Sequence, residues 1–457
     1  MSATGTSTGA PPVDGAAPVR RPTVDGASLA IVYVLLLTVI PARLVLAGLP
    51  ISLSPSDIVA LGTALTWLCA TCTMTLGVAK GRSPVRTALF AFAVACLLSY
   101  GLAAMRYTPG DELKLADRTL LIMLGLTGFA IAVCDGVRTG ERLERLLKAA
   151  VVGGAIMGVF GALQFLFAYD ATRLLNLPLL RAATEGGVVL DRGGLPRVAS
   201  TTGHPIEFGV VCAMLLPLAA HFAFAARDRG EPQRVWWACT GLIASGLLFS
   251  VSRSPILGVA VAFLVLLVGW PARRMARIVA GSAGALAVLA VVYPKILRTI
   301  YGLFANFGAD SSVEYRRHRY EIAQTEFAKH PLFGRGIGTW YVPKYIAFDN
   351  QWIMTALDAG AVGVLTLAGI LLAGIYACAR VRWAAECDAR TRSLAVALAA
   401  AIAVPVIGAL TFDLLAFHIA TGLMFLSVGA AGALLRVHRE RTRPPVAAFE
   451  PAAERSR

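Results

Sequence analysis

Long apolar stretches without a single charged residue limit what this chain can fold into. Ser254–Trp270 and Ile278–Tyr293 are two of them. A bilayer core about 30 Å thick needs roughly 20 apolar residues per helical crossing, and these stretches approach that length with their flanks. Since 57% of the residues are hydrophobic and only 15% are charged, a soluble fold would lack the polar surface to cover them. The chain is therefore predicted to be an all-α integral membrane protein.

Hydropathy along the chain predicts about twelve transmembrane helices. The predicted spans are 28–47, 57–77, 86–104, 118–135, 149–168, 206–225, 236–251, 254–270, 278–293, 351–378, 394–412 and 416–435. Residues 28–436 thus form a polytopic membrane domain. Polar, Pro- and Ala-rich tails at 1–27 and 437–457 are predicted to be disordered and cytoplasmic.

The basic residues indicate how the chain is oriented. With both termini cytoplasmic, most of the 42 Lys and Arg residues fall in inner tails and short inner loops, as the positive-inside rule requires. The short outer loop 48–56 has none. The net charge of +15 is therefore interpreted as a topology signal, and no nucleic-acid partner is expected. The predicted location is the cell inner (cytoplasmic) membrane, with any active site on the extracytoplasmic side.

Two large outer loops, about 169–205 and 294–350, collect Arg and Lys against this rule. The basic residues are Arg173, Arg181, Arg192 and Arg197 in the first loop, and Lys295, Arg298, Arg316, Arg317, Arg319, Lys329, Arg335 and Lys344 in the second. Guanidinium groups suit phosphate oxygens, so an anionic ligand at the outer membrane face is one explanation. Solvated charges close to anionic lipid headgroups are the other.

The second outer loop carries signals of local structure. Ser311 and Glu314 form a capping box that starts a helix, and His330-Pro331 ends it. Arg316 shares the apolar face of this surface helix with Tyr320, Ala323 and Phe327. Three glycines within Gly334–Gly338 permit close backbone approach to a ligand. Arg253, alone at a hairpin tip between two spans, either binds a ligand or snorkels to the interface.

Several of these segments, taken in order, resemble the O-antigen ligase and O-antigen polymerase superfamily. They are Arg197–Pro205, Phe249–Ser254, Arg316–Tyr320, His330–Gly338, Asp349–Trp352 and Asp358–Gly363. The resemblance covers roughly residues 190–370. It implies a multi-span glycosyltransferase whose donor is a glycan on undecaprenyl diphosphate. The acceptor hydroxyl would belong to a growing glycan or a lipid-linked core.

The same resemblance implies roles for individual residues. Arg253 and Arg316 match the family's arginines that hold the diphosphate. The family's ligases carry a His immediately before an Asn-x-aromatic segment, whereas this chain has Asp349 before Asn350 and Trp352. This departure favours a polysaccharide polymerase, or a ligase for another acceptor, and Asp349 can still act as a general base.

The expected chemistry is inverting glycosyl transfer. Asp349, His204 and Glu207 remain alternatives for the base. The expected catalytic residues are Asp349, Arg316, Arg253 and His204, and the expected substrate-binding residues are Arg197, Glu207, Arg317, Arg319, Arg335, Gly336, Asn350 and Trp352. No acidic pair in the outer loops has a recognisable metal-ligand pattern, so neither metal nor cofactor is expected. Expected partners are the lipid-linked donor, the acceptor and membrane lipids, together with a chain-length regulator or a flippase.

A secondary transporter or flippase of a lipid-linked or anionic substrate is the alternative. Twelve spans fit it. Ionisable residues within the spans are few, and no convincing repeat relates the two halves of the chain, which disfavours it. Asp358 is open to two interpretations, a functional acid or a residue that faces a polar cavity.

Overall fold

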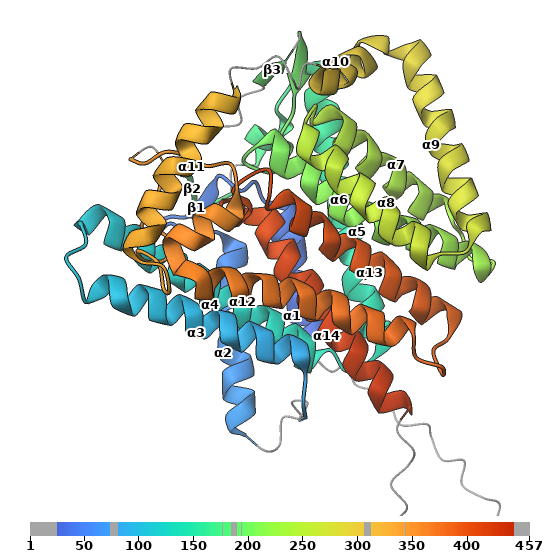
Figure 1. The fold of residues 1–457 in the computed structure, drawn as a ribbon. Helices are drawn as coiled ribbons and strands as arrows, with labels where there is room; N and C mark the ends of the chain where they lie inside the picture. The colour runs from blue at the N-terminus through green and yellow to red at the C-terminus, as the bar shows by residue number, and fades with distance from the viewer. Residues whose placement is uncertain are drawn as a thin grey trace, which may run out of the picture.

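The computed structural model describes residues 25–73, 81–175, 177–183, 190–192, 194–305, 312–342 and 344–442. Within these ranges the protein is mainly helical (Figure 1). Eight described helices are long and apolar enough to cross a membrane, which confirms a multi-pass membrane protein. They are α3 (Pro84–Ala104), α4 (Gly110–Gly136), α5 (Gly140–Phe167), α6 (Pro205–Asp228), α9 (Ala272–Val292), α12 (Gln351–Arg382), α13 (Ala389–Gly408) and α14 (His418–Thr442).

Each of the twelve predicted stretches coincides with a helix. Four of these twelve helices are not among the eight. Three are apolar but shorter, namely α1 (Gly26–Val39), α7 (Arg234–Phe249) and α8 (Arg253–Gly269). The fourth is α2 (Pro55–Cys72), which has 18 residues. The count of twelve crossings and the placement of both termini in the cytoplasm stay predictions. The first stretch was predicted too long, since α1 ends at Val39 rather than near residue 47. Pro41 explains the end, because proline disfavours helix in the residue before it and Ile40 is extended.

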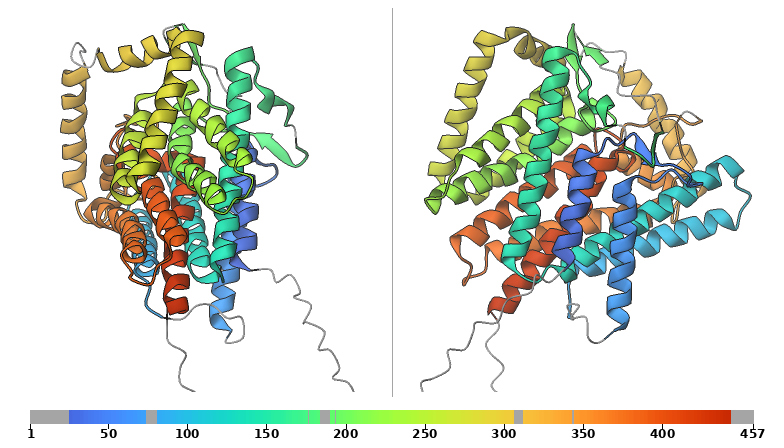
Figure 2. Two further views of the ribbon diagram at one scale, coloured as in Figure 1. Left: turned by 90° about the vertical axis from the view of Figure 1, so that its right-hand side faces the viewer. Right: turned by 180° about the vertical axis from the view of Figure 1, so that it is seen from behind.

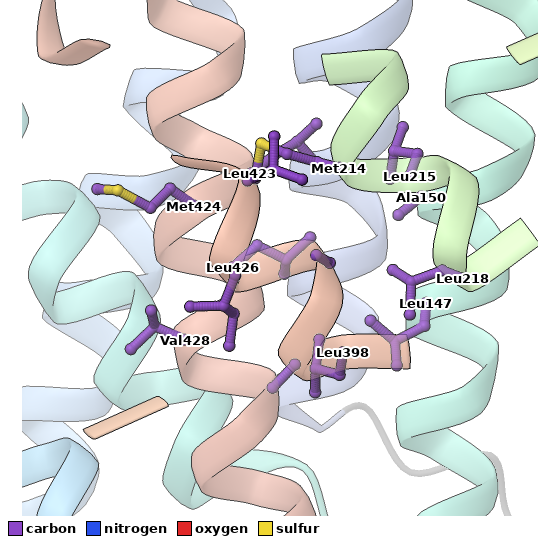
Figure 3. Close-up of a cluster of buried hydrophobic side chains, with 14 of the residues drawn as sticks. Leu147, Ala150, Met214, Leu215, Leu218, Leu398, Leu423, Met424, Leu426 and Val428 are labelled. Atoms are coloured by element: carbon purple, nitrogen blue, oxygen red, sulfur yellow. The ribbon is translucent and has the colours of Figure 1, made fainter. Parts of the chain in front are cut away.

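The centre of the bundle is formed by α6 and α14, whose apolar windows are 94% buried. Figure 3 shows Leu147 of α5, Leu215 and Leu218 of α6, Leu398 of α13 and Leu426 of α14 in one cluster of buried side chains. Small residues let the backbones approach closely. A Cβ added to Gly429 of α14, for instance, would lie 2.6 Å from the carbonyl oxygen of Ala130 in α4.

One end of the bundle carries closely paired basic side chains and is called the basic end below. Arg142 contacts Asp25 at 2.8 Å, and Arg86 contacts Asp135 at 3.0 Å. Arg436 of α14 donates to the carbonyl of Cys134 in α4. The first and last described segments of the chain therefore lie at the same end of the bundle.

At the opposite end, the two predicted outer loops contain more secondary structure than expected. In the first loop, β2 (Leu180–Ala182) pairs antiparallel with β1 (Leu44–Leu46), which lies in the first predicted span, and β3 (Leu190–Arg192) pairs antiparallel with β4 (Leu195–Arg197). The second loop contains α10 (Pro294–Ala305), which was not predicted, and α11 (Ser312–Lys329), which was. The capping residue Ser311 lies outside the described residues.

The segment α9–α11 extends away from the bundle. Figures 1 and 2 show α9 along one edge of the molecule, α10 across the end and α11 on the other side. Only 6% of the apolar window of α9 is buried. An apolar helix with so few protein neighbours is suited to contact with lipid on most of its circumference.

Candidate active site

A cleft of about 780 Å³ lies at the end of the bundle opposite the basic end. It is bordered by the first turn of α8, the middle of α11, the start of α12 and the end of α13. Its polar lining consists of Arg197, Ser252, Arg253, Ser254, Arg319, Asp349, Asn350 and Thr411. Side chains up to 214 positions apart in the sequence thus share one cavity, which three guanidinium groups make positive.

A turn between α7 and α8 brings two of these arginines together. Ser252 precedes α8 and is buried, and its hydroxyl donates to the carbonyl of Ser250 at 2.8 Å. Arg197 donates from Nη2 to the Ser252 hydroxyl at 2.8 Å and from Nε to the Ser250 carbonyl at 3.4 Å. Arg253 is the first residue of α8. The end of β4 and the start of α8 are therefore joined, with both guanidinium groups at the cleft.

The third arginine is paired with Asp349, the only carboxylate among the described residues that line the cleft. Nη1 of Arg319 lies 3.2 Å from Oδ2 of Asp349. The Arg319 side chain is 17% exposed, whereas that of Asp349 is 70% exposed. Asp349 has a φ of +51°, a left-handed conformation that aspartate tolerates better than most residues. Its carboxylate is accessible to a bound substrate.

Asn350 and Asp413 hold the backbone around Asp349. The Asn350 side chain caps α12 by accepting from the backbone N–H groups of Trp352 and Ile353, at 3.0 and 3.3 Å. The backbone N–H of Asn350 donates to Oδ1 of Asp413 at 2.9 Å. Burial and the nearby Asp349 carboxylate raise the pKa of Asp413, although the hydrogen bond from Asn350 opposes them.

Asp413 was missed in the sequence. It lies in the short connection between α13 and α14, between the predicted spans 394–412 and 416–435. Gln351 strengthens the contact between the start of α12 and this connection. Its backbone N–H donates to the Ala409 carbonyl at 2.8 Å, and its Oε1 accepts from Leu415 N–H at 2.7 Å. The one available signal was an isolated acidic residue between two apolar spans at the predicted outer face.

The two other candidate bases have different surroundings. His204 caps α6, with Nδ1 accepting from Ile206 N–H at 3.2 Å. Burial and the positive charge of Arg197 lower the pKa of His204, while Asp349 raises it in part, so the imidazole is neutral near pH 7. The residues that line the cleft include neither His204 nor Glu207.

Glu207 connects α6 to the start of α14. Its Oε1 accepts from the N–H groups of Ile419 at 2.6 Å and Ala420 at 3.3 Å, and its Oε2 accepts from Gly203 N–H at 3.0 Å. The side chain is buried, with 1% of the residue exposed. A carboxylate that accepts from the unpaired N–H groups at a helix N-terminus stabilises that helix. The contacts of Glu207 are therefore those of a residue that stabilises the start of α14.

The glycine-rich segment contacts another part of the backbone. Gly360 has φ +66° and ψ −165°, which interrupts α12. Four hydrogen bonds pair the segment with the interruption, from Arg335 N–H to Leu357 O, Gly336 N–H to Asp358 O, Ala361 N–H to Pro331 O and Val362 N–H to Leu332 O. A Cβ at Gly334 would lie 2.4 Å from Asp358 backbone atoms. The close approach to a ligand predicted from these glycines is, at Gly334, an approach to α12, whereas Cβ atoms added to Gly336 and Gly338 would meet Ala103 of α3 and Thr119 of α4. We call the pairing of 331–336 with 357–362 the clasp.

Two expected binding residues, Arg335 and Gly336, belong to the clasp, and Asp358 supports it. Asp358 accepts from Gly338 and Trp340 N–H groups at 3.0 and 3.3 Å. Arg335 lies 2.7 Å from Glu112, which is fully buried at the start of α4 and also 2.8 Å from Lys344. Arg335 and Gly336 are thus outside the lining of the cleft.

Arg316 and Arg317 lie on α11, three and two positions before Arg319 respectively. Their side chains lie outside the described residues, so their proposed contacts stay predictions. Trp352 lines a neighbouring groove. Within the described residues, no three His, Cys, Asp or Glu side chains are grouped so that they could hold a metal ion, and metal independence also stays a prediction.

Residues 238–368 match a family model described as O-antigen ligase. The match includes Arg253, Arg319, Asp349 and the whole clasp, although it spans less than a third of the chain. It confirms the resemblance to the O-antigen ligase and polymerase superfamily. No curated protein matches the chain. Together with the apolar helices, the match supports an O-antigen ligase-like, glycan-handling membrane enzyme.

Proposed function

We propose that this protein transfers a glycan from undecaprenyl diphosphate to an acceptor hydroxyl at the outer face of the cytoplasmic membrane. The favoured activity is that of a cell-surface polysaccharide polymerase, and an O-antigen-ligase-like transfer is the second. The observation that carries the proposal is the cleft, which Arg197, Arg253 and Arg319 line together with an accessible Asp349. Three cations beside one carboxylate suit a reaction that releases a diphosphate and needs a base.

The proposed step is a single displacement. The acceptor oxygen attacks the anomeric carbon from the face opposite the diphosphate and forms the new glycosidic bond. The bond from the anomeric carbon to the diphosphate oxygen breaks, and its electron pair stays on the diphosphate. The acceptor proton passes to Asp349, or to neutral His204 as the alternative. The guanidinium groups stabilise the negative charge that develops on the leaving diphosphate.

The ion pair between Arg319 and Asp349 couples donor binding to this step. A diphosphate bound at Arg319 competes with the carboxylate for the guanidinium group, 3.2 Å away. Donor binding would thus free Asp349 for the acceptor hydroxyl.

The test uses purified protein in lipid nanodiscs with a lipid-linked oligosaccharide, without ATP or an ion gradient. Wild-type protein should form new glycosidic bonds, and Arg316→Ala or Arg253→Gln should be slower by roughly 10²–10³-fold, as when an oxyanion donor is removed. Arg173→Gln, at an exposed arginine outside the cleft lining, is the matched control. Wild-type transfer by Arg316→Ala would refute its diphosphate role.

Cell-surface glycans separate the remaining functions. A deletion strain that accumulates single repeat units indicates a polymerase, and one that accumulates unattached polymer indicates a ligase. A flippase, in contrast, would move the lipid-linked glycan across vesicles and leave its length unchanged. Transport without any new glycosidic bond in the purified system would therefore replace the proposal with the transporter alternative.

A further inference from the structure

A second hollow adjoins the cleft. This groove has a volume of about 600 Å³ and lies between α11 and the start of α12, on both sides of the α12 interruption. Tyr320 and Asn350 line both the groove and the cleft. The two cavities therefore border each other at these two residues, and Arg319 of the cleft precedes Tyr320 in the chain.

The groove is apolar along its length. On α11, Tyr320 and Phe327 are seven residues apart and so share one face of the helix. On α12, Ala356 and Ala361 lie on either side of Gly360, and the hollow is present because their side chains are small. Leu365 lines the far end and is 71% exposed. Since α12 is one of the apolar helices long enough to cross a membrane, this end of the groove is suited to open toward lipid.

We propose that the groove binds the polyisoprenyl chain of the donor while the adjoining cleft holds its diphosphate. This inference rests on the proposed function. A lipid diphosphate has an anionic head joined directly to a long apolar chain, so its site needs cations that continue into an apolar channel open to the bilayer. The shared residues Tyr320 and Asn350 provide that continuity.

A second apolar groove provides the contrast. Residues of α8, α12 and α13, among them Leu264, Ala379 and Ala399, line a hollow of about 390 Å³ that ends at Arg382 and Trp383, in the last turn of α12. It shares no lining residue with the cleft. Ordinary membrane lipid could contact both grooves, whereas only the groove at α11 is placed to hold a chain whose head is in the cleft.

The expected effect of filling the groove is modest. A polyisoprenyl chain displaced from it still lies among lipid tails, so the loss is one of packing and orientation rather than of burial from water. Ala356→Leu and Ala361→Leu should each weaken undecaprenyl diphosphate binding about tenfold, which corresponds to about 1.4 kcal/mol. Ala379→Leu, in the other groove of the same helix, should leave binding unchanged.

Competition binding in nanodiscs tests this with three probes that share the same head. Compared with wild-type protein, the two groove variants should bind undecaprenyl diphosphate more weakly. Their affinity for geranyl diphosphate should fall by a smaller factor, and their affinity for inorganic pyrophosphate should be unchanged. Equal weakening of all three probes, or of none, would overturn the proposal. Because no glycan is transferred, retained binding without any transfer activity would count against the proposed function alone.

Photo-crosslinking provides a readout that does not depend on filling the groove. A benzophenone side chain replaces Leu365, and in the control it replaces Leu372, which is 63% exposed on the same helix but lines neither groove. Radiolabelled undecaprenyl diphosphate should label position 365 preferentially, and excess unlabelled compound should suppress that labelling. Equal labelling at both positions would mean general lipid contact only, and the proposal would be wrong.

Discussion

Gly360→Ala tests whether the clasp positions the candidate active site. At φ +66° and ψ −165°, Gly360 occupies a region essentially restricted to glycine, and a strained residue costs about 1–3 kcal/mol. An added Cβ would lie 2.3 Å from the Leu332 backbone and 2.5 Å from Phe333 N, where no flexible side chain can move aside. Overpacking adds about 1–3 kcal/mol. The expected destabilisation is therefore about 2–6 kcal/mol.

Gly369→Ala is the matched control. It lies on the same helix with nothing within 4 Å of an added Cβ, so alanine there should be neutral or slightly stabilising. The assay heats detergent-solubilised protein and measures the temperature at which half remains monodisperse. Gly360→Ala should lower it by about 2–6 °C, whereas Gly369→Ala should not. Glycan transfer should fall as well, because Asp349 and Asn350 precede the half-helix that the clasp holds. Identical behaviour of the two variants would refute the strain argument.

Three further predictions concern side chains at or near the cleft. Arg319→Gln should slow glycan transfer by roughly 10²–10³-fold, and transfer rates matching those of Arg173→Gln would contradict its proposed role. Because the positive charge of Arg197 lowers the pKa of His204, Arg197→Gln should raise that pKa. If His204 is the base, the acidic limb of the pH–rate profile then moves to higher pH, and an unmoved limb removes His204 from that role. Glu207→Ala should lower thermal stability more than Glu207→Gln, since alanine leaves three backbone N–H groups without their acceptor, each at a cost of about 1–3 kcal/mol. A Gln variant that is fully stable yet inactive would instead assign Glu207 a chemical role.

Local signals in the sequence were sufficient to predict most of the helices. Apolar runs placed twelve of them, and the end of α11 at His330-Pro331 followed from proline chemistry. Errors arose where a local cue was overlooked, as at Pro41, or where a short amphipathic helix such as α10 interrupted a stretch assigned as loop. Helix formation depends mainly on neighbours three or four residues away, which a single sequence contains.

The candidate site was predictable only in its parts. The sequence indicated Arg197, Arg253, Arg319 and Asp349 as separate polar residues at one predicted face, without showing that they line one cavity. Asp413 and the groove had no comparable signal, because each depends on α11, α12 and the α13–α14 connection meeting in space.

The amino-acid sequence alone determined that the chain is a helical membrane protein and which of its residues can carry chemistry, since hydropathy and side-chain type are properties of each position. Only the tertiary structure decided how those residues are used. It placed Gly334 against the interruption of α12, more than 20 residues away, and the Glu207 carboxylate against the N-terminus of α14. Such pairings satisfy backbone groups that an interrupted or newly started helix leaves open, and their partners are found by packing rather than by proximity in sequence.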